Sequence, residues 1–150
     1  MLQTSFTNIA NKLNVENDIE YKFDTLFETY LPKIRKLIKD RWLSGKKPNG
    51  NDIGLYDDGE YEKYKFFEVS DKAGYGKVDL TLTGDLGNGI DIGFIDVGEY
   101  EIFSNNYKYE DIIERYGEDN FNITEQETEQ IVQEITTKIV TELLKKAYYE

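Results

Sequence analysis

Apolar residues recur at steps of three and four through the first third of the chain, which is the spacing of one face of an α-helix. The residues on this face are Phe23, Leu26, Phe27, Tyr30, Leu31, Ile34, Leu37, Ile38 and Trp42. Pro32 interrupts the pattern, so the helix must either kink there or give way to a second helix that starts after Leu31. Gly45 and Pro48 then supply a stop signal.

A different period governs residues 77–103, where apolar and polar residues alternate. Residues 77–83, 90–95 and 99–103 are each predicted to form a strand with one buried face. Glycine-containing turns are expected at 84–89 and around Gly98. Consecutive strands joined by short turns predict an antiparallel β-meander of three to four strands.

The helical period returns near the C-terminus. Residues 107–116 suit a short helix that ends at Gly117. Thr124 and Glu127 have the spacing of a capping box, which predicts the start of a long final helix that runs to about Ala147. The apolar face predicted for this helix consists of Ile131, Val132, Ile135, Ile139, Val140, Leu143 and Ala147.

The remaining segments carry weaker patterns. Residues 1–20 are polar and asparagine-rich, which indicates an N-terminal arm or a short helix. Residues 46–59 are predicted to form a loop. Residues 61–69 are compatible with a helix or a strand, and we favour a short helix. The whole chain, 1–150, is therefore predicted to be one α+β domain, with the meander packed against long amphipathic N- and C-terminal helices.

Composition excludes several kinds of chemistry. The chain has no cysteine and no histidine, which rules out a zinc finger, a thiol nucleophile, a Ser-His-Asp triad and any disulfide. Its first ten residues lack the features of a signal peptide and its apolar runs are short, so no membrane partner is expected.

Charge is unevenly distributed. Residues 31–50 carry seven cations and one acid, a net charge of +6. Because the whole chain has a net charge of −12, the other 130 residues carry a net −18. A surface this acidic repels phosphate backbones and argues against wrapping around a duplex. The basic segment has three interpretations: a solvated helix face, a contact with nucleic acid, or a contact with the acidic remainder of a neighbouring copy in a ring.

No catalytic or cofactor site is predicted. Asp79 and Asp85 would serve a carboxylate-dependent hydrolase, but both are placed on a polar face or in a turn, where carboxylates are simply ionised. The loop from Asn49 to Glu60 resembles an EF-hand register, but Ile53 occupies a ligand position, so no metal is expected. The glycines of residues 84–89 lack the lysine of a phosphate-binding loop.

Tyrosine offers a different role. The chain has twelve tyrosines, and tyrosine suits subunit interfaces because it buries a large area at low entropic cost and keeps a polar group. Loop and near-loop residues are therefore the candidate inter-subunit contacts: Lys46, Lys47, Tyr56, Asp57, Asp58, Tyr61, Tyr64 and Tyr75.

Several segments carry a resemblance to a known class of proteins. They are WLSGKKPNGNDIGLY (42–56), VDLTLTGD (78–85), RYG (115–117) and FNIT (121–124). With these segments the chain resembles small virion proteins of tailed phages, in particular tail-completion or neck proteins of Bacteroidetes-type and crAss-like phages. The resemblance covers roughly residues 42–125.

The resemblance implies a subunit of an oligomeric ring at the head–tail junction. DNA would pass through the ring without sequence-specific binding, and the partners would be other copies and the portal, neck or tail proteins. The protein would be found in the virion, and in the host cytoplasm during assembly. The alternative hypothesis is an acidic inhibitory protein that mimics DNA and occupies a basic groove of a host nucleic-acid enzyme.

Overall fold

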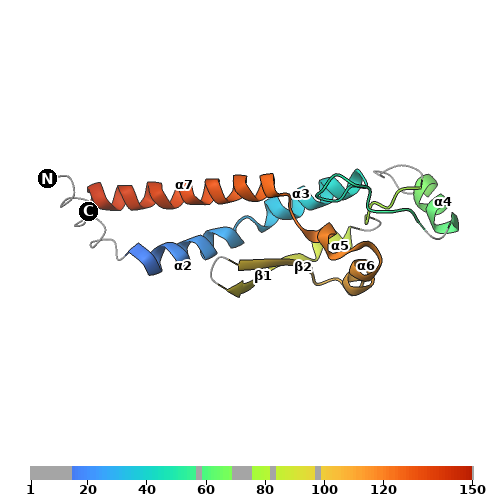
Figure 1. Ribbon diagram of the computed structural model, residues 1–150, viewed down its shortest axis with the longest axis horizontal. Coiled ribbons are helices and arrows are strands. Elements are labelled where there is room, and N and C mark those ends of the chain that lie inside the picture. Colours follow the sequence, from blue (N-terminus) through green and yellow to red (C-terminus); the bar gives the residue numbers. More distant parts are fainter. Residues whose placement is uncertain (1–14, 57–58, 69–75, 82–83, 97–98, 150) are drawn as a thin grey trace.

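The computed structural model describes residues 15–56, 59–68, 76–81, 84–96 and 99–149. Within these residues the chain is α+β, with six α-helices, one short 3-10 helix and a two-stranded antiparallel sheet (Figure 1). The molecule is elongated, with a long C-terminal helix along one side (Figure 1). Most of the predicted N-terminal arm lies outside the described residues, and Val15 already belongs to a helix.

Two helices replace the long N-terminal helix of the prediction. Helix α2 spans Val15–Glu28 and helix α3 spans Leu31–Leu43. Pro32 lies in the first turn of α3, where its missing N–H removes no helical hydrogen bond. The proline therefore starts a second helix, which is the second of the two predicted outcomes.

The sheet is smaller than predicted. Strands β1 (Ile90–Asp96) and β2 (Glu99–Ser104) pair antiparallel with Ile92 opposite Ile102, which confirms two of the predicted strands. The strand predicted over 77–83 is wrong, because the described residues 76–81 form only an isolated bridge between Lys77 and Leu55.

The physical reason for this error lies at two residues. Asp79, which the alternation placed on a solvated face, is buried in an ion pair with Lys65. Leu80 has a φ of 50°, a left-handed conformation that ends any extended run. Part of the predicted turn at 84–89 is a one-turn helix, α5 (Asp85–Asn88).

The remaining helices follow the predictions closely. Helix α4 spans Gly59–Glu68, which confirms a helix in the ambiguous segment, and α6 spans Tyr109–Tyr116 and ends at Gly117. A 3-10 helix, η1 (Glu118–Phe121), leads to α7 (Glu125–Tyr149). The capping box is confirmed: the Thr124 N–H donates to Glu127 at 2.7 Å, and the Glu127 N–H donates to the Thr124 hydroxyl at 3.1 Å.

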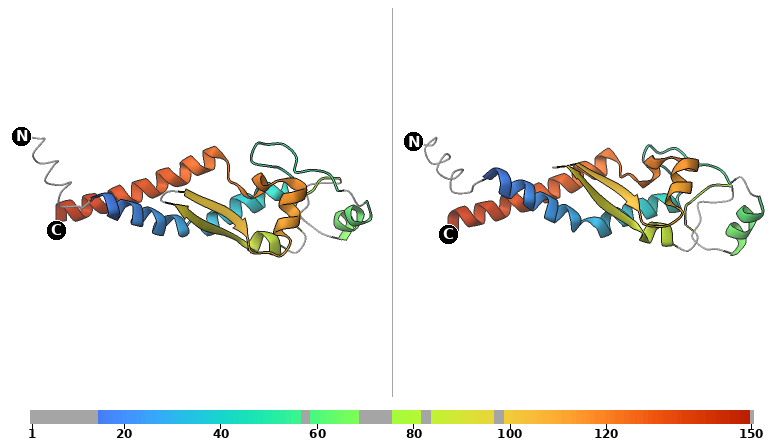
Figure 2. Two further views of the ribbon diagram at one scale, coloured as in Figure 1. Left: turned by 60° about the horizontal axis from the view of Figure 1, so that its bottom comes forward. Right: turned by 90° about the horizontal axis from the view of Figure 1, so that it is seen from below.

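The core joins α3, η1, the start of β1 and one side of α7. Trp42 and Phe121 are fully buried and meet edge to face, with their ring centroids 5.2 Å apart. Helix α2 lies between α7 and the hairpin, where Phe27 contacts Tyr100 with the ring centroids 4.2 Å apart (Figures 1 and 2).

One side of α7 provides its buried residues: Ile131, Ile135 and Ile139. The prediction that Val132 and Val140 share this buried face is wrong, since they are 40% and 47% exposed. Within the described residues, no helix has the length and apolar character needed to cross a bilayer.

Candidate inter-subunit site

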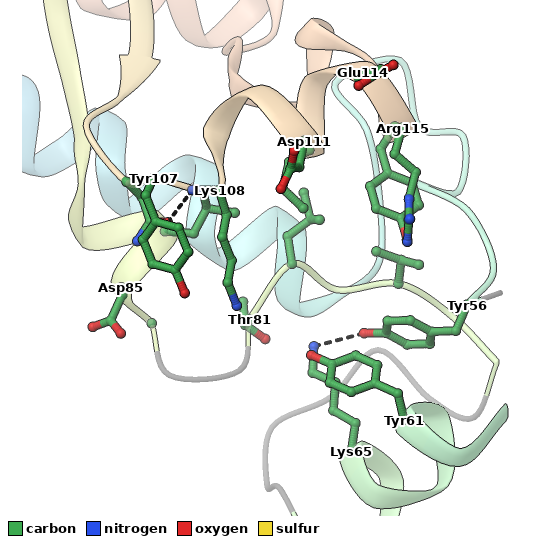
Figure 3. Close-up of a pocket in the computed structure, with 17 residues that line it drawn as sticks. Tyr56, Tyr61, Lys65, Thr81, Asp85, Tyr107, Lys108, Asp111, Glu114 and Arg115 are labelled. Carbon is green, nitrogen blue, oxygen red and sulfur yellow. Dashed lines mark hydrogen bonds between the residues drawn. The ribbon is translucent and has the colours of Figure 1, made fainter. Parts of the chain in front are cut away.

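A cleft of about 1120 Å³ lies at the end of the molecule formed by α4, α5 and α6 (Figure 3). One wall consists of Tyr56 together with Tyr61 and Lys65 of α4. Residues 106–116, which contain α6, form the opposite wall, and residues 78–81 lie between the two. The cleft therefore joins segments that lie far apart in the sequence, which no local pattern could indicate.

A buried ion pair lies behind one wall, and its lysine lines the cleft. Lys65 is 3% exposed and Asp79 is 1% exposed, and the Lys65 ammonium donates to the Asp79 carboxylate. Lys65 also donates to the Tyr56 hydroxyl at 2.8 Å, and that hydroxyl donates to Asp79 Oδ1 at 3.3 Å. Burial lowers the pKa of Lys65 to about 8 and raises the pKa of Tyr56 above its usual value.

Local backbone geometry holds the carboxylate in place. The Thr81 N–H donates to Asp79 Oδ1 at 3.0 Å, an Asx-type turn that accompanies the left-handed Leu80 between them. Asp79 Oδ2 and the Thr81 hydroxyl are buried without a hydrogen-bond partner among the described residues. Lys65 is the buried residue of α4. A polar cluster, and not an apolar core, therefore attaches this helix to the rest of the protein.

Tyrosines line the same wall. Tyr56 and Tyr61 meet edge to face with their ring centroids 5.4 Å apart, and burial raises the pKa of Tyr61. Tyr64, on the same helix, is exposed and does not line the cleft. The opposite wall carries Lys108 and Arg115 beside Asp111 and Glu114 (Figure 3). Because charges of both signs face the cleft, it differs from the single-signed groove that tracks a nucleic-acid backbone.

The two candidate lysines contact their own chain. Lys46 forms an ion pair with Asp52 at 2.6 Å. Lys47 donates to the Tyr116 carbonyl at the end of α6 at 2.7 Å and lies 3.3 Å from the Asp119 carboxylate. A cation at a helix C-terminus is favourable for the helix dipole, so Lys47 stabilises the joint between the 46–56 loop and α6.

The rest of the basic segment is engaged in the same way. The contacts are Lys33 with Glu134, Arg35 with the Ile90 carbonyl, Lys36 with Asp40, Lys39 with Asn88, and Arg41 with Glu127 and the Asn122 carbonyl. Each of the seven cations thus has a partner within the chain, and several join α3 to distant segments. This use of the basic segment was not among the three interpretations made from the sequence.

The structure brings together only some of the predicted contact residues. Tyr56 and Tyr61 meet at the cleft, while Lys46 and Lys47 lie in the loop behind it. Asp57, Asp58 and Tyr75 lie outside the described residues. Of the two hydrolase candidates, Asp79 is in the buried ion pair and Asp85 lines the cleft.

Lys65 is the site residue that the sequence reasoning missed. It lies among Tyr64, Phe66 and Phe67, and a lysine within an aromatic run is the one signal that could have suggested burial. Its partner is fourteen residues away, so no helix or strand spacing connects the two.

Comparisons with known proteins return nothing: no family model, no curated protein and no solved structure matches this chain.

Within the described residues, no group of three or more acidic side chains is arranged to hold a metal ion.

Proposed function

We propose that this protein is a structural subunit of an oligomeric ring at the head–tail junction of a tailed phage. The observation that carries the proposal is a pair of unlike surfaces at separate places on an elongated molecule. One is the tyrosine-lined cleft, and the other is the free end of the hairpin, where Phe94 and Ile95 are more than half exposed. Strand β1 runs away from α5, so the hairpin end points away from the cleft (Figures 1 and 2).

Unlike surfaces favour head-to-tail contacts between copies. When one face of a subunit binds a different face of the next, the arrangement closes into a ring if the rotation between neighbours allows it. An apolar hairpin end that inserts into the cleft of a neighbour would bury Phe94 and Ile95 against Tyr56 and Tyr61. Aromatic and apolar groups are the residues that dominate such contacts.

The charge distribution supports the same role. The cations of residues 31–50 are paired within the chain. The charged groups that are left to contact other molecules are therefore mainly acidic. A wall of that sign lets DNA pass without adhering to it. The partners are then the portal, neck or tail proteins of the virion, as the sequence resemblance implies.

The acidic surface also favours the second candidate, an acidic protein that mimics DNA. An acidic surface whose cations are internally neutralised would fit the basic groove of a nucleic-acid enzyme. This candidate differs from the first in that it acts as a separate protein bound to an enzyme and has no place in the virion.

Native mass measurement and electron microscopy of the purified chain, alone and with virion proteins, test the proposal. We expect a closed ring with a central hole. The substitution Ile95→Asp should prevent ring formation, because it places a carboxylate at the hairpin end, whereas Tyr21→Glu, at a more exposed position on α2, should not.

Two outcomes would overturn the proposal. The first is a chain that stays monomeric at all concentrations and is absent from virions. The second is salt-sensitive capture of a nucleic-acid enzyme by a monomer, which would favour the DNA mimic. If the ring forms equally well with Ile95→Asp, the hairpin contact is wrong.

A further inference from the structure

The free end of the β1–β2 hairpin carries two acidic residues that face each other. Asp96 and Glu99 are partners in the antiparallel ladder, and both side chains are exposed. Like charges directly opposite each other on neighbouring strands destabilise a sheet. The pair therefore weakens the hairpin by itself, and a cation supplied by another molecule would offset the repulsion.

Apolar side chains lie beside these carboxylates. Phe94 and Ile95 are 59% and 55% exposed. The ladder pairs Phe94 with Tyr100 and Asp96 with Glu99, so Ile95 has no partner on β2, as in a β-bulge. Bulges re-aim side chains and are common at sheet edges. The hairpin end therefore presents exposed apolar and acidic groups together.

Helix α2 holds this end of the hairpin in place. The Tyr100 hydroxyl donates to the Asp24 carboxylate of α2, and the Tyr100 ring packs on Phe27 with the ring centroids 4.2 Å apart. Phe94 meets the Tyr100 ring edge to face, with the centroids 6.0 Å apart. A segment that is ordered before binding loses less conformational entropy when a partner covers it, so the hairpin end is suited to insertion.

The cleft offers a matching cation. Lys108 precedes α6, is exposed and lines the cleft, and Figure 3 shows its side chain pointing into the cleft. Its ammonium lies 5.6 Å from the centre of the Tyr107 ring and forms no ion pair with any described residue. The cations of residues 31–50 differ in this respect, since each has a partner within the chain. Lys108 is therefore a cation of the cleft that is left to contact a bound molecule.

We propose that Lys108 pairs with Glu99 at the hairpin end of the neighbouring copy, and that this pair selects the hairpin end as the occupant of the cleft. The inference rests on the ring of the proposed function and names the contact that gives the ring its specificity. The hairpin end of a chain points away from its own cleft, so the pair forms between copies (Figures 1 and 2). The apolar residues of the hairpin end then contact the tyrosine wall, while Glu99 faces α6.

Charge complementarity favours a second copy in spite of the net charge of −12. Two such acidic chains repel each other over most of their surface. At this contact the cleft supplies a cation and the hairpin end supplies two carboxylates, so the interaction is attractive where the two copies are closest. The end of α7 also exposes two tyrosines, at 148 and 149, but they follow Lys145 and Lys146, which Lys108 would repel. The cleft therefore attracts the hairpin end and not the end of α7.

Charge reversal on both sides of the contact tests the pair. Lys108→Glu and Glu99→Lys should each raise the Kd of self-association about tenfold or more, because a like-charge contact replaces an attractive one. Sedimentation velocity and native mass measurement give this Kd. The double variant should recover most of the association, since opposite charges face each other again. An equal mixture of the two single variants should also associate, because every contact between unlike chains joins opposite charges.

Glu99→Lys separates the specific pair from the general repulsion between acidic chains. It makes the net charge two units less negative, so general repulsion alone predicts stronger or unchanged association, whereas the proposed pair predicts weaker association. It also removes the like-charge pair with Asp96, so the single chain should be at least as stable in urea denaturation. The matched controls are Lys146→Glu and Glu129→Lys, which make the same changes of charge at exposed positions of α7 and should leave the Kd nearly unchanged at physiological salt.

The outcomes distinguish this pair from the ring itself. A ring that forms as well with Glu99→Lys as with the natural chain overturns the pair and leaves the ring standing. A double variant that associates no better than the single variants has the same consequence. A natural chain that stays monomeric at every concentration overturns the ring and, with it, the pair.

Discussion

The buried ion pair between Lys65 and Asp79 provides the sharpest test of how the cleft is held together. Replacing Lys65 with methionine keeps the apolar stem but leaves the Asp79 carboxylate with only the Tyr56 hydroxyl and the Thr81 N–H as donors. Breaking a buried ion pair by removing one partner costs about 3–5 kcal/mol. We expect Lys65→Met to lower the free energy of unfolding by about 3 kcal/mol, which corresponds to roughly 6–12 °C in Tm for a chain of this size.

Urea denaturation followed by the fluorescence of Trp42, the single tryptophan, measures this loss. The control is Lys63→Met on the same helix, because the Lys63 side chain is mostly exposed and lies 3.9 Å from Glu60. Lys63→Met should change the free energy of unfolding by less than about 0.5 kcal/mol.

A double-mutant cycle completes the test. Asp79→Asn alone leaves Lys65 buried without its counter-charge, whereas the double variant leaves neither charge. The double variant should therefore be more stable than the sum of the single effects predicts, by at least about 1.5 kcal/mol. Strictly additive effects, or a loss below about 1 kcal/mol for Lys65→Met, would refute the reasoning that this pair attaches α4 to the body.

Two further predictions follow from the same structure. Thr124→Ala should cost about 1 kcal/mol by the same assay because it removes the acceptor for the Glu127 N–H, while Thr124→Ser should retain most of the stability. Ile135→Ala should cost about 2–5 kcal/mol, and Val132→Ala, at an exposed position of the same helix, should cost much less. Equal losses at the two positions would mean that the wrong side of α7 has been assigned to the core.

Local signals predicted the elements whose hydrogen bonds are short-range in sequence. The capping box at Thr124 places the start of α7 within one residue, because both of its hydrogen bonds join groups three residues apart. The hairpin of β1 and β2 follows from alternation on both sides of a glycine-containing turn. Pro32 divides α2 from α3 because it has no N–H to donate to the carbonyl four residues before it, that of Glu28, where α2 ends.

The predictions failed where a distant partner overrides the local pattern. Residues 77–83 alternate as a strand does, but Asp79 is buried by a lysine fourteen residues away, and the chain turns at Leu80. On α7, Ile131 and Val132 are equally apolar and adjacent, so periodicity alone cannot say which of two neighbouring ridges is covered. The packing of α7 against α2, together with its ion pairs to Lys33 and Arg41 of α3, decides it by burying Ile131 and leaving Val132 exposed.

By itself, the sequence determined the α+β character, the hairpin, the helix ends, the acidity and the absence of thiol and imidazole chemistry. These properties depend on composition or on groups a few residues apart. Only the tertiary structure decided that the basic segment pairs with its own chain, that Lys65 lines a cleft and pairs with the buried Asp79, and that Val132 and Val140 of α7 are exposed. These features depend on contacts between segments far apart in the chain, such as Lys47 with Asp119 and Lys33 with Glu134. Such contacts form only after the loops between the segments have closed, and their geometry is not encoded in any local spacing.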